Sequence, residues 1–135
     1  MNTLQNFSAP IGRVFLAAIF IMSGISKITN YAGTQGYMEA MGVPGVMLPL
    51  VIALEVLGGI AIVIGFKARL LAFLMAGFSA VSAILFHADF ADQTQMTMFM
   101  KNIAIAGGFL MIVAHGAGAY SLDNRQSKIS QLQRS

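Results

Sequence analysis

Four long apolar runs, each about as long as a helix that crosses a lipid bilayer, constrain the fold of this chain more than any other feature. They occupy about residues 11–28, 47–66, 68–87 and 98–119. A membrane span takes roughly 20 mostly apolar residues, and no run here contains more than two charged residues. The runs are continuous rather than alternating, which argues against membrane β-strands. The pattern predicts an all-α fold, a four-helix transmembrane bundle.

Composition agrees with a lipid environment. Of the 135 residues, 57% are hydrophobic and 10% are charged, against about 25% charged in a soluble domain. A chain of this length makes one domain and cannot hide so much apolar surface from water. The formal net charge is +3, but the basic residues form no patch, so no nucleic-acid partner is expected. The absence of cysteine excludes disulfides, thiol catalysis and thiolate metal sites in this chain alone.

The polar segments between the spans differ in their expected structure. Residues 29–46 separate the first two spans, and Thr34 is placed to cap a short interfacial helix that ends at Gly42. Residues 88–97 form an acidic polar loop. The segment after Tyr120 is polar and expected to be frayed, with residues 125–135 as a tail.

The distribution of lysine and arginine predicts the orientation of the bundle. Six basic residues lie at the end that holds both termini: Arg13, Lys67, Arg69, Arg125, Lys128 and Arg134. Only Lys27 and Lys101 lie at the other end. Because cytoplasmic loops are enriched in these residues, we expect both termini in the cytoplasm and residues 29–46 and 88–97 on the other side.

Polar groups from all four spans are expected to meet in one layer near the outer face. Glu55 lies about 12 Å below that face at a rise of about 1.5 Å per residue. A charge inside a bilayer costs about 2.5–3.5 kcal/mol and usually faces a partner in the bundle interior. The expected cluster contains Glu55, Lys27, Lys101, Asn102 and His87, supported by Ser23, Asn30, Gly58, Gly59 and Asp89. The inner half of the bundle is expected to be nearly pure hydrocarbon.

Two interpretations of this cluster remain open. In the first, Lys27 or Lys101 neutralises Glu55 and the pair only fixes the register of the helices. In the second, the cluster lines an outward-facing pocket for a small polar or amphipathic ligand. No metal site is predicted, since His87 and Asp89 supply only two ligands on one short segment. Motifs for nucleotide loops, nucleophile elbows and zinc helices are absent from the sequence.

Several short motifs together make a more specific pattern. They are Gly12-Arg13, Ser23-Gly24-x-x-Lys27, Gly42-Val43-Pro44, Glu55-x-x-Gly58-Gly59, Phe86-His87, and Lys101-Asn102 followed by Gly107-Gly108. With this pattern the chain resembles the DoxX family of small bacterial membrane proteins over about residues 8–124. Residues 1–124 are therefore expected to form one DoxX-like four-helix domain.

The resemblance implies an inner-membrane protein, and some relatives are linked to thiosulfate:quinone oxidoreduction or to membrane complexes that handle oxidative and thiol stress. We therefore expect a subunit or accessory of a membrane redox system, with no independent catalytic activity. Its ligand is expected to be quinone-like or sulfur-containing; no other cofactor is evident. Glu55 would accept or shuttle a proton, Lys27 and Lys101 would hold anionic groups, and Asn102 and His87 would donate hydrogen bonds.

Two alternatives from other functional classes stay open. The chain could be a non-catalytic scaffold that recruits other membrane proteins, or a small-molecule transporter. Beyond the lipid bilayer, the expected partners are redox subunits or further copies of the chain itself.

Overall fold

The regular structure of the chain is helical throughout the part that the computed structural model describes, residues 3–134. In chain order the elements are α1 (Thr3–Thr29), α2 (Tyr31–Ala40), the 3-10 turn η1 (Gly45–Met47), α3 (Leu48–Ile64), α4 (Ala68–Phe86), α5 (Gln93–His115) and α6 (Leu122–Arg134). Four stretches are long and apolar enough to cross a membrane: Thr3–Thr29, Gly45–Ile64, Ala68–Phe86 and Gln93–His115. The predicted four-helix bundle is confirmed.

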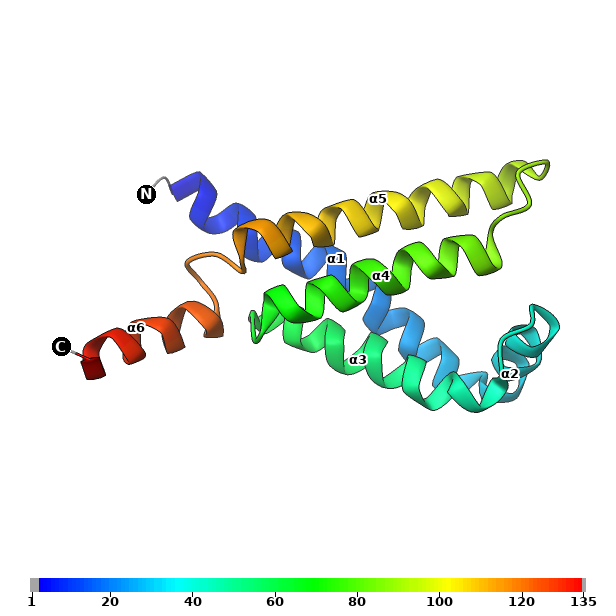
Figure 1. Ribbon diagram of the computed structural model, residues 1–135, viewed down its shortest axis with the longest axis horizontal. Helices are drawn as coiled ribbons and strands as arrows, with labels where there is room; N and C mark the ends of the chain where they lie inside the picture. The colour runs from blue at the N-terminus through cyan, green and yellow to red at the C-terminus, as the bar shows by residue number, and fades with distance from the viewer. Residues whose placement is uncertain (1–2, 135) are drawn as a thin grey trace.

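The four long helices form two hairpins. Helix α1 packs along α3, and α4 packs along α5, with far fewer contacts between the hairpins than within them. Both chain ends lie at the same end of the bundle, which we call the tail end (Figure 1). Helix α2 and the α4–α5 loop lie at the opposite end, which we call the α2 end. The hairpins are close together at the tail end and diverge toward the α2 end (Figure 1).

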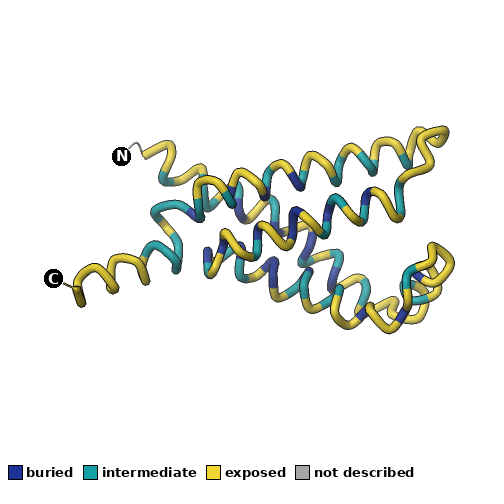
Figure 2. The backbone as a smooth tube through the Cα atoms, in the orientation of Figure 1, coloured by how far each residue is buried: buried dark blue, intermediate teal, exposed yellow. Residues whose placement is uncertain are grey.

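The core is made largely of small residues, and they let the helices approach closely. Along the α1–α3 seam, a Cβ atom added at Gly24 would lie 2.5 Å from Val56 Cγ2, and one added at Gly59 would lie 2.6 Å from Ile21 Cγ1. The outward faces of the long helices carry exposed apolar side chains. Figure 2 marks the exposed residues along each helix. Such faces suit contact with lipid rather than water.

The short helix predicted between the first two spans exists, but its predicted start was wrong. Helix α2 begins at Tyr31 because the chain turns directly after α1, and Asn30 takes the N-cap position. Thr34 lies inside the helix, where its hydroxyl donates to the Asn30 carbonyl at 2.9 Å. The predicted stop at Gly42 is confirmed: its φ is 84°, and the N–H groups of Gly42 and Val43 bond back to Glu39 and Met38.

The tail is also more ordered than the sequence predicted. Residues Leu122–Arg134 form α6 instead of a frayed segment. The Asp123 carboxylate accepts hydrogen bonds from the N–H groups of Lys67 and Ala68 at 2.7 and 2.8 Å. These groups belong to the start of α4, where backbone donors have no partner within the helix. The start of α6 is thereby attached to the α3–α4 turn.

The inner half of the bundle was expected to be nearly pure hydrocarbon. The tail end instead contains a buried arginine. Arg13 of α1 is 2% exposed and lies in the interior beside the end of α3. Its guanidinium donates to the carbonyls of Ile62 and Val63 at 3.1 and 2.7 Å, and to the Tyr120 carbonyl at 2.6 Å. The last carbonyls of a helix lack intrahelical donors, so a buried arginine can satisfy them. Arg13 therefore closes the tail end around α3.

Candidate functional site

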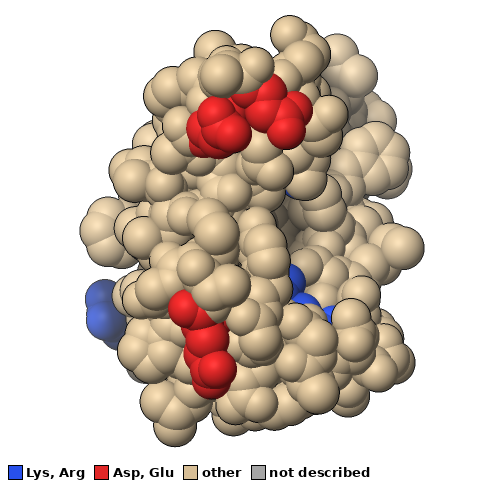
Figure 3. Space-filling model, turned by 90° about the vertical axis from the view of Figure 1, so that its right-hand side faces the viewer, with Lys and Arg blue, Asp and Glu red and all other residues tan. Residues whose placement is uncertain are grey.

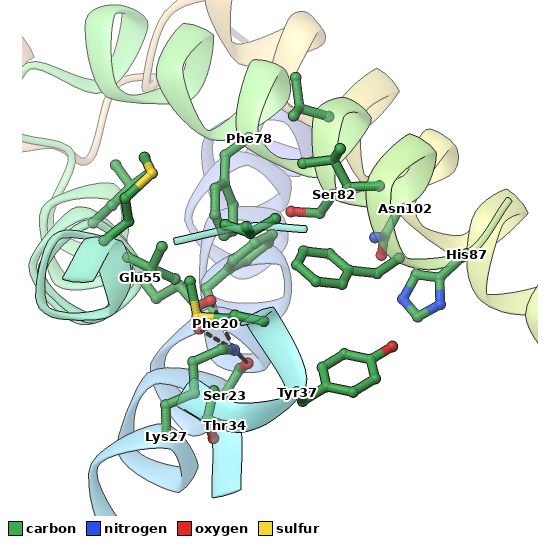
Figure 4. A pocket seen from close by; sticks show the side chains of 18 of the residues that line it. Phe20, Ser23, Lys27, Thr34, Tyr37, Glu55, Phe78, Ser82, His87 and Asn102 are labelled. Carbon is green, nitrogen blue, oxygen red and sulfur yellow. Dashed lines mark hydrogen bonds and ion pairs between the residues drawn. The ribbon is translucent and has the colours of Figure 1, made fainter. Parts of the chain in front are cut away.

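Where the hairpins diverge, they enclose a cavity of about 460 Å³ at the α2 end. Its walls come from all four spans and from α2, and they are mainly apolar. Phe20 and Phe78 are among the apolar residues in the wall (Figure 4), and Phe86 also lines it. The polar residues in the lining are Ser23, Lys27, Thr34, Tyr37, Glu55, Ser82, His87, Lys101 and Asn102. All five residues of the predicted cluster therefore line the cavity. The residues predicted to support that cluster are described below.

One wall of the cavity holds a buried ion pair. Lys27 Nζ lies 2.9 Å from Glu55 Oε1 and 3.2 Å from Oε2, and it donates to Ser23 Oγ at 2.6 Å. The Glu55 side chain is 3% exposed and that of Lys27 is 24% exposed. A carboxylate this deeply buried needs such a partner. The pair joins α1 to α3 and also faces the cavity (Figure 4). A pair that links two helices and a pocket are therefore present at the same place.

The opposite wall carries hydrogen-bond donors that have weak acceptors or none among residues 3–134. Lys101 of α5 is half-buried, and its Nζ reaches only the thioether of Met98, at 3.7 Å. A thioether is a weak acceptor. The side chain of Asn102 makes no hydrogen bond within residues 3–134. His87, at the end of α4, is engaged with Gln95, whose Oε1 lies 2.8 Å from Nδ1.

Helix α2 supplies a third wall that the sequence reasoning missed. Thr34, Tyr37 and Met38 line the cavity from this side. The ring of Tyr37 stacks on that of Phe86 in α4, with centroids 5.5 Å apart and an interplanar angle of 24°. Tyr37 is not among the predicted site residues, because the sequence does not reveal which face of α2 turns inward.

Four of the predicted supporting residues lie outside the cavity lining. Asn30 caps α2, and Asp89 is exposed in the α4–α5 loop. Gly58 and Gly59 are buried where α3 packs, against Met75 and Ile21 respectively. Only Ser23, the fifth, joins the cluster directly. Among residues 3–134, no group of three or more His, Asp or Glu side chains is arranged to hold a metal ion.

Charge is distributed unevenly around this end of the molecule. Glu39 of α2 and Asp89 and Asp92 of the loop are exposed acids. Figure 3 shows acidic patches on both sides of a hollow, with basic side chains inside it. The lysines that line the cavity are Lys27 and Lys101. The rim is therefore acidic and the interior basic.

Comparisons with known proteins agree with the motifs. The DoxX family model matches residues 9–88. The chain is 51% identical over 128 residues to the inner membrane protein YqjF of Escherichia coli (strain K12), covering 95% of this chain and 98% of that protein. It is 38% identical over 141 residues to the inner membrane protein YphA of the same organism, covering 93% and 100%.

A more distant relative carries a functional name. The chain is 30% identical over 76 residues to "Putative oxidoreductase CatD" of Bacillus subtilis (strain 168), covering 56% of this chain and 57% of that protein. No solved structure matches the chain significantly. The resemblance drawn from the sequence motifs is confirmed by these matches.

Proposed function

Because the chain belongs to the DoxX family, we propose that it is a bacterial inner-membrane protein that binds an amphipathic, quinone-like ligand as an accessory subunit of a membrane redox system. The observation that carries this proposal is the cavity between the diverging hairpins. It combines apolar walls with a few polar groups that have spare hydrogen-bonding capacity, which is the usual design of a small-molecule site.

The shape and chemistry of the cavity favour a flat aromatic head. A volume of about 460 Å³ lies within the usual range of roughly 300–1,000 Å³ for ligand pockets. Phe20, Phe78 and Phe86 offer aromatic contacts to a ring. Lys101 and Asn102 offer donors to ring oxygens. A quinone-like head uses both kinds of contact, whereas a small sulfur anion would leave the apolar walls unused.

The carboxylate of Glu55 supports a proton-handling role at this site. Among residues 3–134 it is the only Asp or Glu in the lining, and the ammonium of Lys27 lies 2.9 Å from it. Glu55 would accept or shuttle a proton of the bound ligand, while the electrons would pass between the ligand and the partner subunit. His87, near the mouth, would donate a hydrogen bond through the nitrogen that does not face Gln95.

An accessory role follows from what the chain itself offers. It has no cysteine, so any thiol chemistry linked to the ligand must take place on a partner protein. The relative whose name refers to an oxidoreductase matches only 56% of this chain, and we carry over from it no more than the redox class. The chain would supply the ligand site, and a partner subunit the substrate site.

We propose further that the α2 end faces the periplasm. Five exposed basic residues lie toward the tail end: Lys67, Arg69, Arg125, Lys128 and Arg134. The two lysines of the α2 end instead line the cavity. This asymmetry fits the positive-inside rule with cytoplasmic termini. An alkaline phosphatase reporter fused after Ser135 should be inactive, because the enzyme works only in the periplasm. An active fusion would contradict the proposed orientation.

Native mass spectrometry of the full chain, released from a mild detergent, tests the ligand proposal. We expect the protein to carry an added mass from a bound small molecule. Organic extraction should recover that molecule as an amphiphile that absorbs ultraviolet light. Wild-type protein that carries no small molecule and takes up no added decylubiquinone would contradict the proposal and favour a non-catalytic scaffold. A transporter is disfavoured by the buried core that closes the tail end around Phe109 and Ile62.

A further inference from the structure

We infer that the cavity selects the anionic form of its aromatic ligand, with Lys101 as the counter-ion and Glu55 as the group that limits the positive charge. This inference rests on the proposed function, because it concerns the same cavity. It adds the charge of the ligand, which neither the family nor the relatives specify. The ligand class is an aromatic amphiphile with a deprotonated ring oxygen, such as a hydroxyquinone enolate.

The charges that line the cavity do not balance. Two lysines and one glutamate contribute side chains to the lining. Glu55 is committed to Lys27, since both of its oxygens lie within 3.2 Å of that ammonium. No carboxylate lies within ion-pair distance of Lys101 in residues 3–134. One positive charge is therefore left over in the cavity.

The leftover charge is held in poor surroundings. The Lys101 ammonium is half-buried between apolar walls, and its nearest hydrogen-bond partner is the Met98 sulfur at 3.7 Å. An ammonium in such surroundings loses hydration without gaining a strong acceptor. A ligand oxygen with a full negative charge would provide that acceptor, and charge-assisted hydrogen bonds are roughly twice as strong as neutral ones.

The neighbouring residue strengthens the case for an oxygen-rich head. Asn102 follows Lys101 on α5, lines the same cavity and has no partner for its side-chain amide within residues 3–134. The amide can donate to a second oxygen of the ligand. Lys101 and Asn102 together can therefore bind two adjacent oxygens, as found in a 2-hydroxyquinone enolate.

The acidic rim does not cancel this preference. Glu39, Asp89 and Asp92 are exposed to solvent, and none of them lines the cavity. Exposed charges are screened over about 8 Å at physiological salt, whereas charges inside an apolar cavity are screened much less. The rim can slow the approach of an anion, but the bound state is governed by Lys101, Lys27 and Glu55.

This arrangement gives Glu55 a testable effect on affinity. Glu55→Gln would remove the negative charge and leave Lys27 as a second unneutralised ammonium in the cavity. Binding of an anionic head should then become tighter, although the proposed proton acceptor is lost. If Glu55 instead held the ligand directly, the same substitution would weaken binding.

A pair of matched probes tests the inference on the full chain in detergent. One is 2-hydroxy-1,4-naphthoquinone, which is an anion at neutral pH, and the other is its neutral 2-methoxy ether. Equilibrium dialysis against protein-free micelles gives both dissociation constants. We expect wild-type protein to bind the anion about tenfold more tightly, which corresponds to about 1.4 kcal/mol. Lys101→Met should bring the ratio of the two affinities close to one, and Glu55→Gln should raise it.

The control is Lys128→Met, which removes an exposed lysine of α6 far from the cavity and should leave the ratio unchanged. Equal affinities in wild-type protein, or a ratio that Lys101→Met does not alter, would overturn this inference while the proposed function stands. Failure of wild-type protein to bind either probe would overturn this inference, and failure to take up decylubiquinone as well, in protein that carries no small molecule, would overturn the proposed function. Circular dichroism checks that each variant folds. If Glu55→Gln does not fold, the Lys101→Met result alone tests the inference.

Discussion

The two ends of the bundle each bury one basic side chain, but they use it differently. At the tail end, Arg13 donates to three backbone carbonyls and so joins α1 to α3 and to the segment before α6, beside a smaller cavity of about 250 Å³. At the α2 end, Lys27 pairs with Glu55, and a cavity remains beside the pair. A basic group that satisfies the backbone holds helices together. A basic group that pairs with a carboxylate joins the same two helices and also presents its charge to the cavity.

The largest effect should come from removing the arginine that closes the tail end. Arg13→Met would leave the carbonyls of Ile62, Val63 and Tyr120 without this donor in a buried place. A buried acceptor that loses its donor costs about 1–3 kcal/mol, so we expect a total loss of about 3 kcal/mol from these carbonyls. Thermal unfolding in detergent, followed by circular dichroism, should show a large fall in midpoint. Exposed Arg125→Met is the control, and equal midpoints for the two variants would contradict the role of Arg13.

A smaller loss is expected from breaking the ion pair at the α2 end. Lys27→Met leaves the Glu55 carboxylate buried without its partner. We expect a loss of about 2 kcal/mol, reduced from the fully buried case because Lys27 is partly exposed. The double variant with Glu55→Gln should recover part of it in a double-mutant cycle. Strictly additive effects of the two substitutions would show that the pair contributes no coupling.

The attachment of the tail should matter less again. Asp123→Ala removes the acceptor for the N–H groups of Lys67 and Ala68. Loss of a helix cap costs about 1 kcal/mol, and amide exchange should quicken in α6 and at the start of α4. Hydrogen–deuterium exchange measures both regions in one experiment. Unchanged protection at the start of α4 would mean that Asp123 does not stabilise that helix.

The smallest effect on stability should come from the third wall of the cavity. Tyr37→Leu removes the ring that stacks on Phe86 and links α2 to the second hairpin. We expect a loss of about 0.5 kcal/mol but a clearly faster release of bound ligand. Tyr31→Leu, in the same helix but outside the lining, is the matched control. Identical release rates for the two variants would remove α2 from the closure of the cavity.

The sequence predicted one end of the bundle better than the other. The layer that contains Glu55, Lys27 and Lys101 was visible because charges in apolar runs are rare and need partners. Which lysine pairs with Glu55 was not predictable, since it depends on how far each helix rotates about its axis when the helices pack. That rotation places Lys27 against α3 and leaves Lys101 across the cavity.

The tail end was harder to predict for a different reason. The partners of Arg13 are backbone carbonyls, which every residue carries and no motif marks. Its position near a span end made it look like an ordinary topology signal. The order of α6 was missed similarly, because Asp123 binds backbone N–H groups that tertiary contacts bring close. The start of α2 was missed because the Asn30 side chain makes no cap hydrogen bond that would mark the position.

The claim that a ligand binds between the diverging hairpins is tested most directly by filling the cavity. Ile105 lines the cavity, and Ile103, two residues earlier on α5, lies outside the lining with 38% of its surface exposed. Both Ile105→Trp and Ile103→Trp are made, and binding of decylubiquinone to each full-length variant is measured in the same detergent. The account predicts at least tenfold weaker binding for Ile105→Trp and near wild-type binding for Ile103→Trp. Equal binding by the two folded variants would show that the ligand does not occupy this cavity.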